Sequence, residues 1–409
     1  MSKQRKIFLF LAVPLVVIFA VVTTLVINRT PNDTANNQSS SENNKTENTA
    51  YKAGKAISQG CEGEGFPYKL SKLPMDESDF SVVIPYGLMV GGHVTPIDHQ
   101  YFAPADYMSK RDVYEVYAMA DATITEIGER TNDRGTEYRL VFAITCNYFY
   151  YYDLVTSLTS EIKKVYDDAN SGQFKKAINI KVKAGELIGR IGGQTLDFAV
   201  WDTTKPLKGF IFPEHYKAEN WKLYTADPLD YYTNELKTKV LARSPRTAEP
   251  VSGKIDYDVD GKLIGNWFEE GTNWYGGKTN GNGGEYWGGH LSFAPDHYDP
   301  TYFIISIGDF EGQPKQFTTI ANTPDPASVS VDTGLVKFEL VQWGYTDAEG
   351  TPWFGNSVIE GPKAKPQTSV QGCALVQMKD TKSIQFESFP KQSCSAVAGF
   401  TGKVKTYTR

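Results

Sequence analysis

Val116-Tyr-Ala-Met-Ala-Asp-Ala-Thr-Ile-Thr-Glu-Ile-Gly128 contains two short runs of β-branched and aromatic residues on either side of a turn. Such runs between turn residues are typical of β-strands. Similar runs on either side of this stretch predict further strands at Phe80–Pro85, Tyr138–Thr145 and Asn179–Val182. We therefore expect a strand-dominated domain over residues 56–233.

One segment of this domain has helical periodicity. Four apolar side chains recur at intervals of three or four residues, which would place them on one face of a helix; they are Leu154, Leu158, Ile162 and Val165. We therefore predict a single helical insertion at Tyr150–Asp167 in a mainly β domain.

Over about residues 82–201 the chain resembles the lysostaphin/LytM-type zinc metallopeptidases. The strands and turn of Val116–Gly128 are similar to a strand pair of that family, and Tyr151-Tyr-Asp-Leu154 stands where the family carries Tyr-x-His-Leu. Val182-Lys-Ala-Gly-Glu-Leu-Ile-Gly-Arg-Ile-Gly-Gly193 and Leu196-Asp-Phe-Ala-Val200 resemble its closing hairpin and His-x-His-Phe strand. The resemblance implies a β sandwich-hybrid domain. A similar hairpin occurs in biotinyl-lipoyl-like domains.

The zinc ligands of that family are incompletely matched. Thr195 and Asp197 stand at the His-x-His positions, and if His99 replaces the first His ligand, Ala103 stands where an Asp should follow. A catalytic zinc ion needs about three protein ligands and an open position for water. If zinc is retained, the ligands that the resemblance leaves are His93, Asp98, His99 and Asp197. No general base is evident, so the resemblance implies a domain that has lost the zinc chemistry. The alternative for both histidines is a turn residue bonded to the backbone.

The second half of the chain has a different composition. Residues 234–252 contain Arg243-Ser-Pro-Arg-Thr-Ala-Glu-Pro250, which is typical of a linker. Short strands between glycine-rich turns follow over 253–409, and this pattern favours an antiparallel β barrel or sandwich. The predicted strands are Phe303–Ile307, Leu335–Gln342, Cys373–Met378 and Ser383–Phe386.

Two motifs of this second region point to binding. A glycine-rich stretch over residues 271–289 carries aromatic rings that could stack on sugars or fold back on the sheet; they are Trp274, Tyr275, Tyr286 and Trp287. Alternate carboxylates before Gly261 resemble the first half of a calcium loop; they are Asp256, Asp258 and Asp260. The twelfth position is Trp267 instead of Glu, and a plain Asp-Gly turn explains the same residues.

The N-terminal segment and the cysteines indicate export. Ile7–Ile27 carries no charge, follows three basic residues, and is long enough to cross a hydrocarbon core of about 30 Å with the N-terminus in the cytoplasm. Residues 28–55 are polar and predict a disordered stalk. A cleaved signal peptide is the alternative to this anchor. An exported chain with four cysteines predicts two disulfides, Cys61–Cys146 and Cys373–Cys394, with four free thiols as the alternative.

The balance of charged residues argues against one class of function. The formal net charge is −6, from 42 basic and 48 acidic residues, and no basic stripe is present, which argues against nucleic acid as a partner. We expect a membrane-anchored extracytoplasmic protein whose inactive peptidase-like domain is a scaffold or binds a cell-envelope glycan or protein. No cofactor is required, calcium stays open, and zinc is disfavoured. The alternatives are an active zinc metallopeptidase with unusual ligands and a ligand-binding β barrel.

Overall fold

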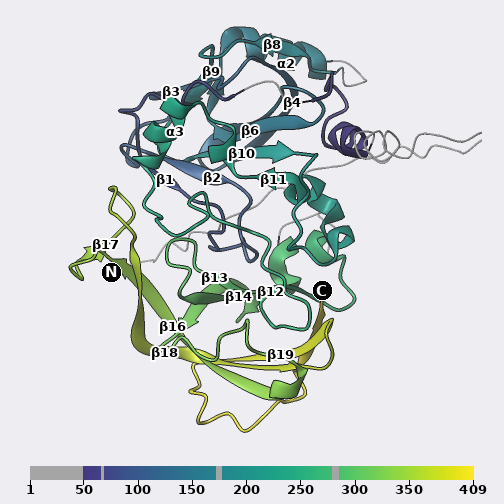
Figure 1. Cartoon of the computed structure of the whole chain (residues 1–409), viewed down its shortest axis with the longest axis vertical. Coiled ribbons are helices and arrows are strands. Elements are labelled where there is room, and N and C mark those ends of the chain that lie inside the picture. Colours follow the sequence, from purple (N-terminus) through teal and green to yellow (C-terminus); the bar gives the residue numbers. More distant parts are fainter. Residues whose placement is uncertain (1–48, 66–68, 172–176, 279–284) are drawn as a thin grey trace, which may run out of the picture.

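The computed structural model of the chain describes residues 49–65, 69–171, 177–278 and 285–409. The described protein is mainly β, with one large antiparallel sheet in each half of the chain (Figure 1). The predicted anchor at residues 7–27 and most of the predicted stalk lie outside the described residues. Within the described ranges, no helix is both long and apolar enough to cross a membrane.

The first sheet contains most of the strands predicted from the N-terminal half. In spatial order they are β1 (Phe80–Ile84), β2 (Gln100–Pro104), β10 (Leu196–Asp202), β6 (Tyr148–Val155), β5 (Gly135–Ala143), β4 (Ala122–Asn132) and β8 (Ile180–Val182), with β11 (Thr225–Ala226) beside β10. A small separate sheet contains β3 (Tyr114–Tyr117), β9 (Leu187–Ile191) and β7 (Ser157–Leu158). The stretch at Val116–Gly128 therefore passes from one sheet to the other, because β3 pairs with β9 while β4 pairs with β5 and β8.

The helix predicted at Tyr150–Asp167 was placed too early. Residues 148–155 form the central strand β6, and the helix α2 (Ser160–Asn170) begins only after Thr159, whose hydroxyl accepts a hydrogen bond from the backbone N–H of Ile162. The five consecutive aromatic residues at the start of β6 explain the error, because aromatic side chains pack well on both faces of a buried strand. One helical insertion is present, as expected, but shifted along the chain.

Both faces of the first sheet are covered. Along β6, Tyr148, Tyr150 and Tyr152 lie in one hydrophobic core, while Phe149 and Tyr151 lie in another. The first core includes Leu236 and Val240 of α3 (Asn234–Leu241), so the start of the predicted linker at 234–252 is packed against the first domain. The second core extends to Phe268 and Tyr275 of the C-terminal half, and this face carries the candidate site.

The last residues of the predicted stalk are helical. Residues 49–57 form a helix, with Ala50 and Ile57 buried, whereas the composition predicted disorder as far as residue 55. The helix lies against the turn between β5 and β6. A Cβ atom on Gly54 would lie 1.5 Å from the carbonyl oxygen of Cys146, so only glycine permits this approach.

We therefore expect Gly54→Ala to destabilise the protein by about 1–3 kcal/mol, the usual cost of forcing extra atoms into a packed site. Urea unfolding of the full chain measures this loss. Gly399→Ala is the matched control, because a Cβ there meets nothing within 4 Å. An equal effect of the two substitutions would show that the helix is not held against Cys146.

The second sheet is antiparallel throughout, as predicted for residues 253–409. Its order is β15 (Gln313–Thr319), β14 (Phe303–Phe310), β13 (His290–Pro295), β12 (Gly265–Glu269), β20 (Lys405–Thr408), β19 (Ser383–Pro390), β18 (Lys363–Met378), β16 (Leu335–Thr346) and β17 (Pro352–Trp353). β15 also pairs with β16, so the pairings form a closed ring through every strand of this sheet except β17. One buried apolar cluster lies inside this ring and includes Trp267, Phe293 and Phe338. The alternative of a ligand-binding β barrel requires a cavity among such side chains.

The two predicted disulfides are confirmed. Cys61 is bonded to Cys146, which joins the segment after the first helix to the β5–β6 turn. Cys373 of β18 is bonded to Cys394, which holds the segment after β19 against the sheet.

Candidate functional site

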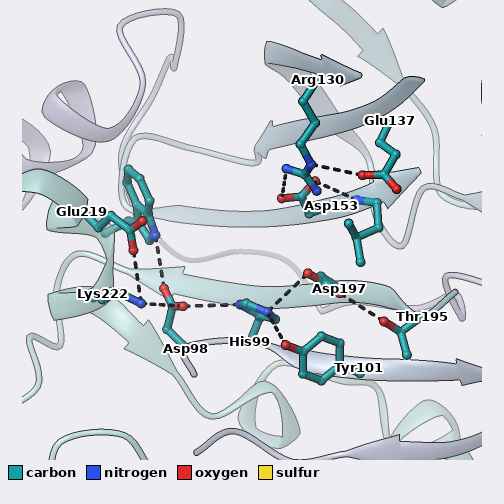
Figure 2. A network of polar contacts seen from close by, with 12 residues as sticks. Asp98, His99, Tyr101, Arg130, Glu137, Asp153, Thr195, Asp197, Glu219 and Lys222 are labelled. Carbon is teal, nitrogen blue, oxygen red and sulfur yellow. Dashed lines mark hydrogen bonds and ion pairs between the residues drawn. The ribbon is translucent and has the colours of Figure 1, made fainter. Parts of the chain in front are cut away.

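Three adjacent strands position the candidate site on one face of the first sheet. Asp197 of β10 lies directly opposite Tyr101 of β2 on one side and Asp153 of β6 on the other. Side chains of directly opposed residues in an antiparallel sheet project from the same face. His99 lies two residues before Tyr101 and therefore joins the same group (Figure 2).

His99 stands at the centre of this group. Its Nε2 lies 3.3 Å from Oδ2 of Asp197 and 3.0 Å from the hydroxyl oxygen of Tyr101. Its Nδ1 lies 3.4 Å from Oδ1 of Asp98. The imidazole is thus held from both sides by carboxylates, and its residue is only 8% exposed.

A buried lysine completes the arrangement around Asp98. Lys222 lies in η1 (Pro213–Tyr224), and its Nζ is 2.7 Å from Oδ1 of Asp98 and 3.2 Å from Oε2 of Glu219 (Figure 2). The indole Nε1 of Trp221 donates to the other oxygen of Asp98 at 3.2 Å. The Lys222 side chain is 6% exposed, so this ion pair is almost completely removed from water.

The charges of the site follow from these contacts. Burial opposes ionisation of Asp98, but the Lys222 ammonium and the hydrogen bond from His99 hold its pKa well below the ordinary value. The same carboxylate, with Glu219, raises the pKa of Lys222 against the effect of burial. Burial raises the pKa of Asp197 to about 7. The pKa of His99 is raised by the two carboxylates despite burial. Lys222 and Asp98 are therefore ionised at neutral pH, whereas Asp197 titrates close to it.

The raised pKa values of Asp197 and His99 predict a pH dependence. The folded protein keeps the Asp197 proton to about pH 7, whereas an unfolded chain loses it near pH 3.9, so the stability that it contributes is complete below about pH 4 and lost towards pH 7. The contribution of His99 is complete below its unfolded pKa of about 6.5 and is lost as the pH passes its higher folded pKa. Asp197 and His99 therefore make the urea midpoint fall between about pH 5 and pH 8, while His93 and His290, whose pKa values are lowered by desolvation, add a slope of opposite sign below about pH 6.5.

Asp197→Asn should flatten this slope, because the amide does not titrate. Asp133→Asn, at an exposed position, is the control and should leave the slope unchanged. An identical pH dependence of the urea midpoint in the unaltered protein and in Asp197→Asn would contradict the assignment.

A second charged cluster lies beside the first on the same sheet. Arg130 of β4 donates two hydrogen bonds to Asp153, at 2.7 and 3.0 Å, and one to Glu137 at 3.1 Å (Figure 2). Asp153 stands at the His position of the Tyr-x-His-Leu segment in the resemblance. Its carboxylate is occupied by a bidentate arginine, which is a strong charge-assisted contact.

The predicted zinc ligands come together only in part. Asp98, His99 and Asp197 are neighbours, while the His93 ring centroid lies 5.9 Å from that of His99 and its side chain is exposed. The described ranges contain no group of three or more His, Cys, Asp and Glu side chains arranged to hold a metal ion. The donor set does not fit zinc, because the ammonium of Lys222 already neutralises Asp98.

The predicted calcium loop forms a turn. Asp256 accepts a hydrogen bond from the backbone N–H of Gly209 at 2.7 Å, and Asp258 accepts one from that of Asn266 at 2.8 Å. Asp260 is exposed, and the N–H of Lys262 donates to the carbonyl of Val259 to close the turn. Asp256 and Asp258 thus accept hydrogen bonds from separate backbone segments, as in the plain-turn alternative.

The predicted sugar-binding aromatics mostly fold back onto the protein. Tyr275 is buried and lies under the Lys222 ammonium, 4.9 Å from ring centroid to Nζ. Trp274 stays exposed but stacks on His215 at 4.5 Å between centroids. Tyr286 packs on Tyr275 and His290, and Trp287 lies against the backbone of Gly92. The rings therefore join the two halves of the chain.

The charged residues that complete the site were not predicted from the sequence. Glu219, Trp221 and Lys222 lie in a segment without a recognisable motif, and Trp221 is 123 residues from the Asp98 that it contacts. Arg130 and Glu137 belong to an ordinary alternating hairpin. No local signal in the sequence distinguishes these residues from surface charges.

Comparisons with known proteins add little. No family model matches the chain, and no curated protein matches it. Two solved structures of Helicobacter pylori Csd3, from a hexagonal and an orthorhombic crystal, are similar to part of it, with 17% and 18% sequence identity and TM-scores of 0.22 and 0.21. The alignments cover 34% of this chain and 32% and 33% of the Csd3 chains. The chain thus spans about a third of the Csd3 structures that it matches, and similarity this low carries no argument about activity.

Proposed function

We propose that this chain is a membrane-anchored extracytoplasmic protein whose first domain has a peptidase-like shape and binds a cell-envelope partner without hydrolysing it. One observation carries the proposal: the ammonium of Lys222 is bonded to Asp98 inside the cluster that a catalytic metal would need. A metal-dependent hydrolase requires free carboxylate and imidazole ligands and an open coordination position. Here both imidazole nitrogens and Asp98 are occupied by protein groups.

Export is supported by the uncharged segment at residues 7–27 and by the two disulfides, since disulfides persist mainly in oxidising compartments. The anchor is tested by alkaline extraction of membranes from cells that produce the full chain. Retention in the membrane pellet, with the C-terminus open to protease added outside the cytoplasm, is the expected result. Release of the chain into the soluble fraction would contradict the proposed membrane anchor.

Binding without hydrolysis is tested on the full chain in non-ionic detergent. We expect it to sediment with purified peptidoglycan sacculi, to release no soluble fragments, and to contain zinc well below one ion per chain. Stoichiometric zinc with fragment release that disappears in His99→Ala would establish the metallopeptidase alternative and overturn the proposal. Failure to sediment with sacculi would exclude the glycan and leave a protein partner.

A further inference from the structure

Arg139 differs from the other half-buried and buried arginines that the structure describes. Each of the others donates to a backbone carbonyl or a carboxylate; they are Arg111, Arg130, Arg190, Arg243, Arg246 and Arg409. Arg139 is only partly exposed, and within the described ranges its guanidinium has no hydrogen-bond or ion-pair partner. Buried polar groups are normally paired, and among the half-buried and buried arginines that the structure describes Arg139 alone lacks such a partner.

Aromatic rings hold this guanidinium in place. Its Cζ atom lies over the rings of Tyr151 and Trp221, 4.7 and 4.6 Å from their centroids, and 5.9 Å from that of Trp201. Stacking of this kind uses the face of the guanidinium and leaves its in-plane N–H groups free to donate. Gly128, opposite Arg139 on β4, adds no side chain, and Glu126 of the same strand is close enough for Arg139 to offset part of the rise of its pKa on burial, without a hydrogen bond between them.

The position connects Arg139 to the candidate site. Tyr151 precedes Asp153 by two residues on the same face of β6, and Trp221 is the indole that donates to Asp98. Nearby Arg130 belongs to the same sheet face, but its donors are already used by Asp153 and Glu137. The guanidinium N–H groups of Arg139 are therefore the donors beside Asp98 and Asp153 that no protein group accepts.

We propose that Arg139 recognises a carboxylate group of the bound partner. A guanidinium edge matches the two oxygens of a carboxylate in a bidentate contact. A singly charged carboxylate suits the site better than a dianionic phosphate, because Asp98, Asp153 and Glu219 already place negative charge around Arg139. The inference rests on the proposed binding function and names the chemical group that the partner presents.

The test titrates the full chain in non-ionic detergent with N-acetylglycine, using N-acetylglycinamide as the neutral analogue. Trp201 and Trp221 report binding by their fluorescence, because both contact Arg139. We expect a saturable change with the carboxylate and none with the amide. Arg139→Lys keeps the charge but loses the bidentate contact and should weaken binding about tenfold. Arg139→Met should abolish it, while Arg134→Met, at an exposed position, should not change it.

Several results would overturn the inference. They are no saturable response to N-acetylglycine, an equal response to the amide, an unchanged response in a folded Arg139→Met protein, or tighter binding of inorganic phosphate. If Arg139→Met fails to fold, the test uses Arg139→Lys alone. Its circular dichroism spectrum and urea midpoint should be unchanged, so that weaker binding reports the lost contact and not unfolding. Sedimentation with sacculi that persists without any N-acetylglycine response would refute this inference alone. Fragment release with stoichiometric zinc would refute the proposed function alone.

Discussion

Lys222→Met lowers the free energy of unfolding by about 3–5 kcal/mol, the usual cost of removing one partner from a buried ion pair. Asp98 is 4% exposed, and the variant would leave its carboxylate without a counter-ion in a place where burial opposes its ionisation. Its other contacts, with the Trp221 indole and the His99 imidazole, are weaker than the ammonium contact at 2.7 Å. Glu219 also loses a partner, but its side chain is 31% exposed and water compensates for most of that loss.

The measurement is urea unfolding of the full chain at neutral pH. The double variant Asp98→Asn/Lys222→Met should recover part of the loss, because it also removes the uncompensated charge. Lys163→Met is the control, since Lys163 forms an exposed pair with Asp167 on α2 and such pairs contribute about 0.3–0.5 kcal/mol. If Lys222→Met costs no more than Lys163→Met, the buried ion pair does not hold the site together.

The sequence predicted the parts of the fold that depend on local pattern. Alternating aromatic and β-branched residues indicated the strands at residues 80–84 and 138–143, and cysteine spacing indicated the disulfides. Local pattern failed where two periods compete. The spacing of Leu154 and Leu158 suggested a helix, but the aromatic run of β6 fits between β5 and β10 and determines the outcome.

Only the part of the candidate site on β2, β10 and the loop before β2 could be predicted from the sequence. Asp98, His99 and Asp197 were named together from the resemblance, and the adjacency of β2 and β10 brings them into contact. The contribution of Lys222 depends on how η1 folds back across the sheet, and that placement follows from the shared core containing Tyr216, Phe268 and Tyr275. Such long-range packing produces no periodic pattern in the sequence. The role of Lys222, which neutralises Asp98, therefore could not be predicted from it.

Removing the Cys61–Cys146 disulfide by replacing both cysteines with Ala should cost about 4–5 kcal/mol, because a bond across 85 residues excludes many conformations of the unfolded chain. The same replacement of Cys373 and Cys394, which are 21 residues apart, should cost about 3 kcal/mol on the same argument. Both pairs are measured by urea unfolding of the full chain under identical oxidising conditions.

The first loss of unfolding free energy should exceed the second, because both bonds lie in buried surroundings and differ mainly in the length of the loop that they close. The first bond also holds the turn against which residues 49–57 pack, so its loss should enhance the proteolysis of that helix before global unfolding. A reversed order would mean that native packing, and not the constraint on the unfolded chain, determines the stabilisation. Early cleavage after loss of the second bond alone would contradict the docking of the helix on Cys146.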